Sequence, residues 1–121
     1  MKKTVLCIDD SNTALVLLEF VLSEAGFETI LALSVEDAIQ KIASKVPDLI
    51  LLDLGMPDIS GYEFLEMKSK LDLGKVPILV VSAYDSQESV LKTQHLGAID
   101  FISKPLKIET LLKKIRTYLN V

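Results

Sequence analysis

Short apolar runs alternate along the chain with longer segments of helical periodicity. The runs at residues 4–8, 49–52, 77–81 and 99–103 are too short for ordinary helices and show little polar alternation. They therefore predict strands that are buried on both faces of a sheet. Residues 28–32 alternate polar and apolar side chains instead, which predicts an edge strand.

Capping residues mark the starts of the predicted helices. Ser11 or Asn12 can cap the first helix through a side-chain oxygen. Ser60 and Glu63 stand three residues apart, as in the capping box that opens many helices. The predicted helices span about residues 12–25, 35–45, 62–70, 86–96 and 108–119.

The last two predicted helices have different apolar stripes. The helix at 86–96 has a thin stripe, with Val90, Leu91 and little else. The final helix has apolar side chains at i, i+3, i+4 and i+7, which is typical of an amphipathic helix. Its stripe consists of Ile108, Leu111, Leu112, Ile115 and Leu119.

The alternation of one strand with one helix, repeated five times, predicts the fold class. Right-handed crossovers then give an α/β fold, in which a parallel sheet is covered by helices on both faces. No internal linker, repeat or low-complexity segment interrupts the pattern. We therefore expect residues 1–121 to form a single domain, with no output domain in this chain.

Polar side chains stand directly after the apolar strands. Asp9 and Asp10 follow the first strand, Asp53 the third, Ser82 the fourth and Lys104 the fifth. Because ligands bind at the carboxyl ends of strands in open α/β sheets, these groups should converge into one site. The alternative is that they are independent turn residues, since turns favour Asp and Ser, but that does not explain the lysine.

The segment after the third strand adds turn-forming residues. Pro57, Asp58 and Gly61 predict a turn between Asp53 and the next helix. A buried strand that delivers one acid to its tip, before a turn into a helix, is typical of a functional site. Taken alone, Asp53 could equally be a turn former or a helix cap.

Converging carboxylates predict a metal-dependent phosphate chemistry. Three neighbouring carboxylates raise one another's pKa, and a hard divalent cation such as Mg²⁺ relieves the repulsion. Mg²⁺ neutralises charge on a transferring phosphoryl group, and a carboxylate can accept that group as an aspartyl phosphate. Lys104 and the Ser82 hydroxyl would then hold the phosphoryl oxygens. We interpret His95, the single histidine, as a solvated side chain rather than a general base.

Composition excludes several function classes. The chain carries 13 basic and 17 acidic side chains, a net charge of -4, which gives no support for nucleic-acid binding through a basic surface. The single cysteine, Cys7, lies in an apolar run, so we expect a buried core thiol in a reducing compartment. No apolar stretch is long enough to span a membrane, and no signal peptide is visible. These features predict a soluble, cytoplasmic protein.

Four motifs in fixed order resemble the receiver domain of two-component response regulators, including the chemotaxis regulators. They are I-D-D at 8–10, D-L-G-M-P-D-I-S-G at 53–61, S-A at 82–83 and G-A-I-D-F-I-S-K-P at 97–105. The resemblance covers the whole chain. It implies a flavodoxin-like doubly wound sheet of five parallel strands in the order 2-1-3-4-5, with five helices.

The resemblance also implies the partners and the metal ligands. Asp53 would accept a phosphoryl group from a phosphohistidine of a sensor histidine kinase or histidine phosphotransfer protein. Mg²⁺ would be held by Asp9, Asp10, Asp53 and the backbone carbonyl of Gly55. The activated protein would then act on a downstream effector protein, without direct nucleic-acid binding or membrane insertion.

The same resemblance implies the residues that bind phosphate and switch the surface. Ser82, the Ala83 amide and Lys104 would bind the phosphoryl group. Ser82 and Phe101 would be the switch residues, which reshape the surface of the fourth helix, last strand and last helix. The Lys104–Pro105 peptide bond is expected to be cis.

Two variable positions leave the lifetime of the phosphorylated state undecided. Gly55 puts no side chain two residues after Asp53, and Tyr84 puts a bulky one two residues after Ser82. Both would flank the phosphoryl group and affect the access of water.

An apolar pair on the first helix predicts a docking surface. When Leu18 is placed at the centre of the buried stripe, Val16 and Phe20 point to the opposite side of the helix. They would form a patch beside Asp10 that can contact the helix bundle of the phosphodonor. The alternative is that both are isolated exposed apolar residues.

Three other functions are consistent with parts of the pattern. A Mg²⁺-dependent phosphohydrolase could use the aspartyl phosphate as an intermediate, with Asp58 as a second acid, but the chain has no substrate-binding cap. A flavin-binding module would need a phosphate-cradling loop after the first strand, where acids stand instead. A nonphosphorylated receiver is disfavoured because no site residue is missing.

Overall fold

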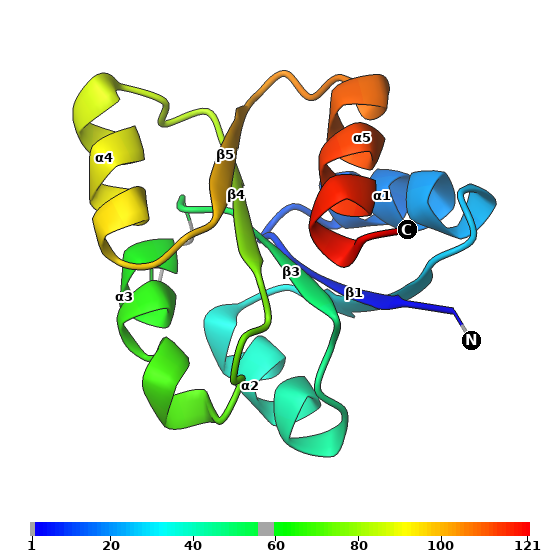
Figure 1. The fold of residues 1–121 in the computed structure, drawn as a ribbon, viewed down its shortest axis with the longest axis horizontal. Coiled ribbons are helices and arrows are strands. Elements are labelled where there is room, and N and C mark those ends of the chain that lie inside the picture. The colour runs from blue at the N-terminus through cyan, green and yellow to red at the C-terminus, as the bar shows by residue number, and fades with distance from the viewer. Residues whose placement is uncertain (1, 56–59) are drawn as a thin grey trace.

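The described part of the chain folds around one parallel sheet. The computed structural model describes residues 2–55 and 60–121, and these form five strands (Figure 1). The strands are β1 (Thr4–Ile8), β2 (Glu28–Ala32), β3 (Leu49–Leu52), β4 (Ile78–Ser82) and β5 (Asp100–Ser103). Their order in the sheet is β2-β1-β3-β4-β5, and every pairing is parallel. The predicted fold class and strand order are therefore confirmed.

Helices connect successive strands, and serine side chains start several of them. The helices are α1 (Asn12–Glu24), α2 (Val35–Ser44), α3 (Gly61–Glu66), α4 (Gln87–His95) and α5 (Ile108–Leu119), with a short 3-10 turn at Lys68–Leu71. A serine hydroxyl accepts a hydrogen bond from a backbone N–H of the first turn in four of them. The capping serines are Ser11, Ser34, Ser60 and Ser86.

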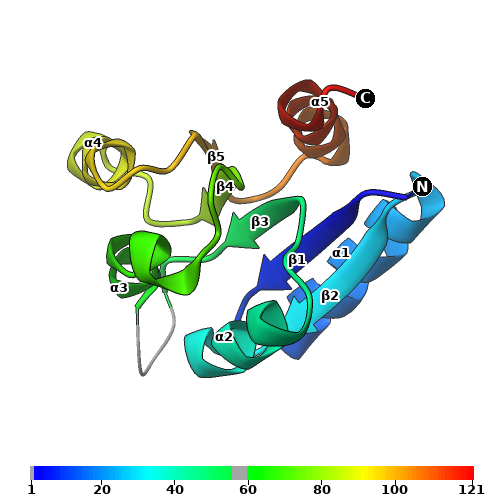
Figure 2. The same cartoon turned by 60° about the horizontal axis from the view of Figure 1, so that its bottom comes forward.

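The sheet separates two apolar cores. Alternate strand residues point to opposite faces, so each strand contributes to both cores. In Figures 1 and 2, α1 and α5 cover one face of the sheet, and α2 and α3 cover the other. The largest side chain with no exposed surface is Phe64 of α3. The strands β1, β3 and β4 are buried along their whole length, as their apolar runs predict.

The edge strand and the α1 stripe also follow the pattern of the sequence. β2 is the outer strand next to β1 and is only partly buried. The predicted α1 stripe is confirmed, because Leu15, Leu18, Val21 and Leu22 are buried. Strands β4 and β5 begin one residue later than predicted.

Three expectations about the helices are wrong. The predicted helix at 62–70 ends at Glu66 and gives way to the 3-10 turn, whose i→i+3 bonds tighten the chain before the buried Leu73. In the thin helix α4, Leu91 is 57% exposed, and Thr93 is the residue that is buried. Ile108, at the start of the α5 stripe, is 46% exposed, whereas Leu111 and Ile115 of the same stripe are buried.

Two further predictions concern the turn before α3 and membrane-spanning segments. The predicted turn at Pro57 and Asp58 lies outside the described residues, and Gly61 begins α3. Within the described part of the chain, no helix has both the length and the apolarity that a membrane span requires.

Candidate functional site

Asp53 stands at the carboxyl end of β3, between the ends of the neighbouring strands β1 and β4. Its backbone N–H donates to the carbonyl of Ile8, which extends the β1–β3 ladder by one residue. A Cβ atom at Gly61 would lie 2.6 Å from the backbone oxygen of Asp53, so α3 can start this close to the strand tip only at a glycine. The Asp53 carboxylate is therefore held at the sheet edge by tight backbone packing.

The three predicted acids form one cluster. One carboxylate oxygen from each of Asp9, Asp10 and Asp53 lies within 4.8 Å of the others. Asp9 and Asp53 are buried and Asp10 is exposed, so the cluster opens to solvent on the side of Asp10. The backbone N–H of Ser11 donates to Asp9 at 2.9 Å, which fixes the orientation of that carboxylate. Clustered hard oxygen donors with an open side suit Mg²⁺, which retains several waters.

Lys104 reaches this cluster from the end of β5. Its Nζ lies 3.0 Å from Asp9 Oδ2 and 3.9 Å from Asp53 Oδ2. The backbone N–H of Lys104 donates to the carbonyl of Ser82, which sets the lysine beside β4. The Lys104–Pro105 peptide bond is cis, as the resemblance implies. The ammonium group thus compensates one of the three negative charges.

The electrostatic environment of Asp53 opposes its ionisation. Burial raises the pKa of Asp53, and the negative charge of Asp9 raises it further. Lys104 and the backbone N–H of Gly55 act in the opposite direction without cancelling the rise. The ionised cluster therefore carries a free-energy cost that a cation would relieve.

Ser82 ends β4, and Ala83 and Tyr84 begin the loop that follows it. The Ser82 side chain is buried, and its Oγ accepts a hydrogen bond from the backbone N–H of Tyr84 at 3.0 Å. Ala83, between them, is exposed. Ser82 thus lies at the tip of β4, as predicted, with its hydroxyl tied to the start of the following loop.

The Tyr84 ring packs over Gly55. A Cβ atom at Gly55 would lie 2.7 Å from Cε2 of Tyr84, which is closer than side chains tolerate. Tyr84 is 63% exposed, so its ring covers Gly55 from the solvent side. The two positions that flank Asp53 and Ser82 are therefore in contact with each other.

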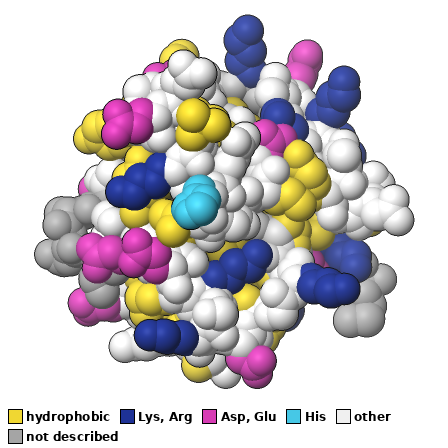
Figure 3. Space-filling model, turned by 60° about the vertical axis from the view of Figure 1, so that its left-hand side comes forward, with side chains coloured by type: hydrophobic (Ala, Val, Ile, Leu, Met, Phe, Trp, Pro, Cys, Tyr) yellow, Lys and Arg dark blue, Asp and Glu magenta, His cyan; other side chains and the backbone are white. Residues whose placement is uncertain are grey.

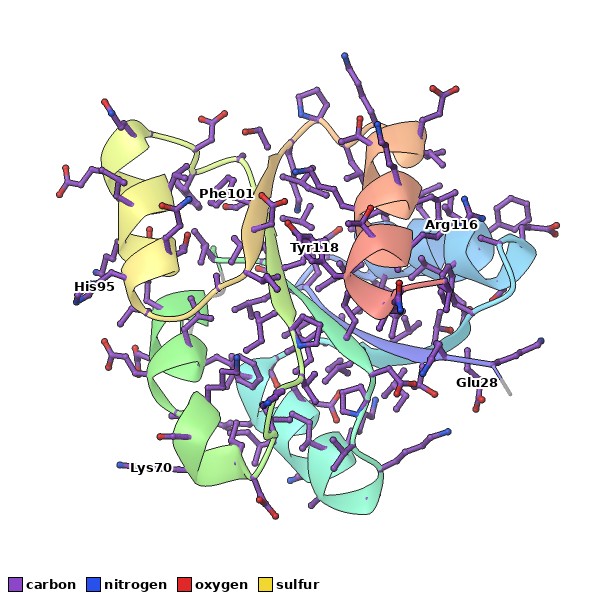
Figure 4. All side chains as sticks on the ribbon, in the orientation of Figure 1. Glu28, Lys70, His95, Phe101, Arg116 and Tyr118 are labelled. Atoms are coloured by element: carbon purple, nitrogen blue, oxygen red, sulfur yellow. The ribbon has the colours of Figure 1, made fainter. Side chains whose placement is uncertain are left out.

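Three other residues that the sequence singled out lie outside the acid cluster. Phe101 is half-buried on β5 and packs against the core on the side of α2 and α3. His95 lies exposed at the end of α4, as expected: its side chain is on the surface in Figure 3 and points away from the sheet in Figure 4. Cys7 is buried in β1, and burial raises the pKa of its thiol to about 12, which makes it an inert core residue.

The exposed apolar patch on α1 contains three residues rather than the predicted two. Val16 is 55% exposed and Phe20 63% exposed, and Leu17, which the helical-wheel argument did not include, is 52% exposed. Leu17 also lines a cavity of about 200 Å³ whose walls include Asp53 and Lys104. The apolar surface of α1 is therefore continuous with the acidic cluster.

One polar network was not predicted from the sequence. The carboxylate of Asp100 on β5 accepts hydrogen bonds from Lys114 Nζ at 2.7 Å and from the Tyr118 hydroxyl at 2.6 Å, both on α5. Lys114 and Tyr118 stand four residues apart, as neighbours on one helical face do. The four-residue spacing of Lys114 and Tyr118 is visible in the sequence, but it does not identify Asp100 as the acceptor of their hydrogen bonds.

Comparisons with known proteins agree with this geometry. A family model described as the response regulator receiver domain matches residues 5–116. The alkaline phosphatase synthesis transcriptional regulatory protein PhoP of Bacillus subtilis is 30% identical over 119 residues, which are 98% of this chain and 49% of PhoP. The chain thus spans about half the length of that regulator.

Two other similar proteins are matched over almost their whole length. Sporulation initiation phosphotransferase F of Bacillus subtilis is 27% identical over 119 residues, which are 98% of this chain and 95% of that protein. The solved structure of a CheY-like response regulator receiver domain protein from Methanospirillum hungatei is 31% identical, with a TM-score of 0.92. The match covers 99% of this chain and 95% of that chain.

Proposed function

The chain belongs to the response regulator receiver domain family, a family of phosphorylation switches, and on that premise we propose that Asp53 is its phosphoacceptor. The observation that carries this assignment is the convergence of Asp9, Asp10 and Lys104 on the Asp53 carboxylate. Asp53 is the member of the acid cluster that stands at the tip of the central strand. The donor is a phosphohistidine of a sensor histidine kinase or a histidine phosphotransfer protein.

The acid cluster is proposed to hold Mg²⁺. Asp9, Asp10 and Asp53 each supply a carboxylate oxygen, and the carbonyl oxygen of Gly55 is the fourth proposed ligand. The set fits a hard cation, because it contains only oxygen donors and opens to water beside Asp10. When bound, Mg²⁺ neutralises charge on the transferring phosphoryl group.

The protein side chains carry out the transfer around this centre. A carboxylate oxygen of Asp53 attacks the phosphorus, and the new O–P bond forms as the P–N bond to the donor imidazole breaks. The electron pair of the broken bond stays on the imidazole nitrogen, and the carboxylate has no proton to lose. Lys104, the Ser82 hydroxyl and the Ala83 amide stabilise the phosphoryl oxygens.

The same residues also promote loss of the phosphoryl group. Water attacks the phosphorus of the aspartyl phosphate, the acyl O–P bond breaks, and Asp53 is returned as a carboxylate with inorganic phosphate released. The protein is thus an acceptor that assists its own phosphorylation and dephosphorylation, rather than a turnover enzyme. A phosphohydrolase function is not favoured, and its proposed second acid, Asp58, lies outside the described residues.

Phosphorylation is proposed to change the surface through Ser82 and Phe101. The Ser82 hydroxyl turns toward the phosphoryl group, and half-buried Phe101 turns further inward. The affected surface is formed by α4, β5 and α5, and it is the proposed contact site for a downstream effector protein. Residues 1–121 are proposed to act as one receiver unit in the cytoplasm.

The exposed patch of Val16, Leu17 and Phe20 on α1 is proposed to receive the phosphodonor. Its occupant is a helix of the donor bundle, because Leu17 lines the same cavity as Asp53 and Lys104. A helix that covers this patch can therefore place a histidine of its own next to the acceptor.

Intact mass tests the phosphoacceptor directly. Incubation with acetyl phosphate and Mg²⁺ should add the mass of one phosphoryl group to the wild type and to Asp85→Asn, a control at an exposed acid. Asp53→Asn should gain no mass, because it lacks the attacking carboxylate, and EDTA should prevent the gain in the wild type. An unchanged mass of the wild-type protein would contradict the proposed function.

Replacing Phe20 by serine should weaken docking without affecting the chemistry. The donor is a histidine kinase or phosphotransfer protein that phosphorylates the wild type. Loss of an exposed aromatic contact should slow phosphoryl transfer from this donor by about tenfold or more. Labelling by acetyl phosphate should remain at the wild-type rate, because Phe20 does not touch the acid cluster.

The matched control for docking is Val46→Ser. Val46 is about as exposed as Val16 but lies between α2 and β3, so this variant removes the same kind of apolar side chain from another surface. It should leave transfer from the protein donor unchanged. Equal losses in both variants, or a loss of acetyl phosphate labelling in Phe20→Ser, would count against a docking role for α1.

A further inference from the structure

The carboxylate of Asp100 joins three groups from two elements. Its Oδ2 accepts hydrogen bonds from Lys114 Nζ at 2.7 Å and from the Tyr118 hydroxyl at 2.6 Å. Its Oδ1 accepts a hydrogen bond from the backbone N–H of Phe101 at 2.7 Å. One side chain therefore binds α5 and the backbone of the proposed switch residue at the same time.

The network is ionic and partly shielded from water. The side chains of Asp100 and Lys114 are 26% and 33% exposed. Burial alone would raise the pKa of Asp100, but the hydrogen bonds from Lys114 and Tyr118 outweigh it and lower that pKa. Asp100 is therefore a charged acceptor at neutral pH, and charge-assisted hydrogen bonds of this kind are stronger than neutral ones.

The network connects the two faces of the sheet. Neighbouring residues of a strand point to opposite faces, and here Asp100 points toward α5 while Phe101 packs on the side of α2 and α3. In Figure 4, Tyr118 lies between α5 and β5, whereas Phe101 lies on the side of β5 toward α4. A displacement of α5 would therefore act on β5, the strand that Lys104 directly follows.

We propose that Asp100 is a positioning residue of the switch, which couples Lys114 and Tyr118 of α5 to Phe101 and opposes the rearrangement that phosphorylation of Asp53 brings. The proposal rests on the proposed function of Asp53. The three hydrogen bonds hold β5 against α5 and fix the backbone of Phe101, so they oppose a rearrangement of Phe101. A partner that draws Lys114 or Tyr118 away from Asp100 would remove this restraint and favour phosphorylation, and phosphorylation would in turn favour that partner.

Tyr118→Phe is the most conservative test, because it removes one hydroxyl and keeps the ring. Lys114→Met is the second variant, and Lys113→Met removes the same charge from the neighbouring, exposed residue as a control. The apparent Kd for beryllofluoride, a phosphoryl mimic, is measured with saturating Mg²⁺. Both network variants should bind at least about fivefold more tightly than the wild type, the lower end of typical coupling, whereas the control should match the wild type.

The resonances of Phe101 provide a readout that needs no phosphoryl group. Its backbone amide and ring signals should shift in the same direction in Tyr118→Phe and Lys114→Met, and should not shift in Lys113→Met. Shifts no larger than those of the control, or an apparent Kd that is unchanged or higher, would overturn the proposal. If the wild type fails to bind beryllofluoride, the proposed function fails, and the Phe101 shifts still decide whether Asp100 couples α5 to Phe101.

Discussion

Replacing Lys104 by methionine should slow the phosphorylation of Asp53 by acetyl phosphate about 10²- to 10³-fold, the scale seen when one preorganised donor is removed from a reacting site. The Lys104 ammonium lies 3.9 Å from Asp53 Oδ2 and 3.0 Å from Asp9 Oδ2, so it is already placed where phosphoryl charge arrives. Methionine keeps much of the side-chain volume but brings no charge. The measurement is the initial rate of phosphoprotein formation at saturating Mg²⁺.

Lys107→Met is the control for this loss. Lys107 is exposed three residues further along, and its substitution removes the same positive charge. It should therefore lower the rate only through long-range electrostatics, which 0.15 M salt screens beyond about 8 Å. If the two variants were slowed equally, the position of the Lys104 ammonium in the cluster would have no special role in the transfer.

Removing one charge from the acid cluster should stabilise the protein when no metal is bound. Asp9, Asp10 and Asp53 carry three negative charges against the single charge of Lys104. Asp53→Asn should therefore raise the free energy of unfolding in EDTA by on the order of 1 kcal/mol, the Coulomb energy of two like charges about 4 Å apart in a solvated site. Urea denaturation of both proteins measures this difference.

The pH dependence of this gain follows from the raised pKa of Asp53. Burial, and then the charge of Asp9, raise that pKa in the folded state above its unfolded value. The cost of ionising Asp53 is thus absent below the unfolded pKa and develops as pH rises through the folded pKa. The advantage of Asp53→Asn should be small near pH 3 and complete at neutral pH.

Mg²⁺ should reverse the ranking of the two proteins. At about ten times its dissociation constant, an ion that binds only the folded state adds about 1.4 kcal/mol to the stability of the wild type. Asp53→Asn and Asp10→Asn should gain much less, because each lacks a ligand, while the control Asp85→Asn should gain as much as the wild type. Variants that are less stable than the wild type in EDTA, and equal gains from Mg²⁺ in all proteins, would show that the acids do not form one metal site.

The sequence predicts well those features that depend on position along one element. Asp53 and Lys104 could be placed at strand tips because an apolar run that stops at a charged residue marks the sheet edge. Strand-helix alternation gave the α/β class, but the strand order came from the family resemblance, because alternation alone permits several orders. Val16 and Phe20 could be placed on the exposed face of α1 because helical periodicity fixes opposite faces.

Features that depend on how two elements meet could not be obtained in this way. Leu17 lies at the margin of the α1 stripe and lines a cavity together with Pro105 and Leu106, which precede α5, so its exposure depends on a segment far away in the sequence. The acceptor of Lys114 and Tyr118 depends on where α5 lies over β5, since 14 and 18 positions separate them from Asp100. After α3 ends, the chain turns back and buries Leu73. The position at which α3 ends depends on this burial, which local helix propensity does not predict.

The contact between Gly55 and Tyr84 has a consequence for the construction of chimeric receivers. Because a Cβ at position 55 would meet the Tyr84 ring at 2.7 Å, the residue that position 55 accepts depends on the residue at position 84. A donor loop that brings any larger residue to position 55 must be transplanted with its own residue at position 84, or the ring must leave its place. Positions 55 and 84, which are 29 positions apart in the chain, should therefore be exchanged together between receivers.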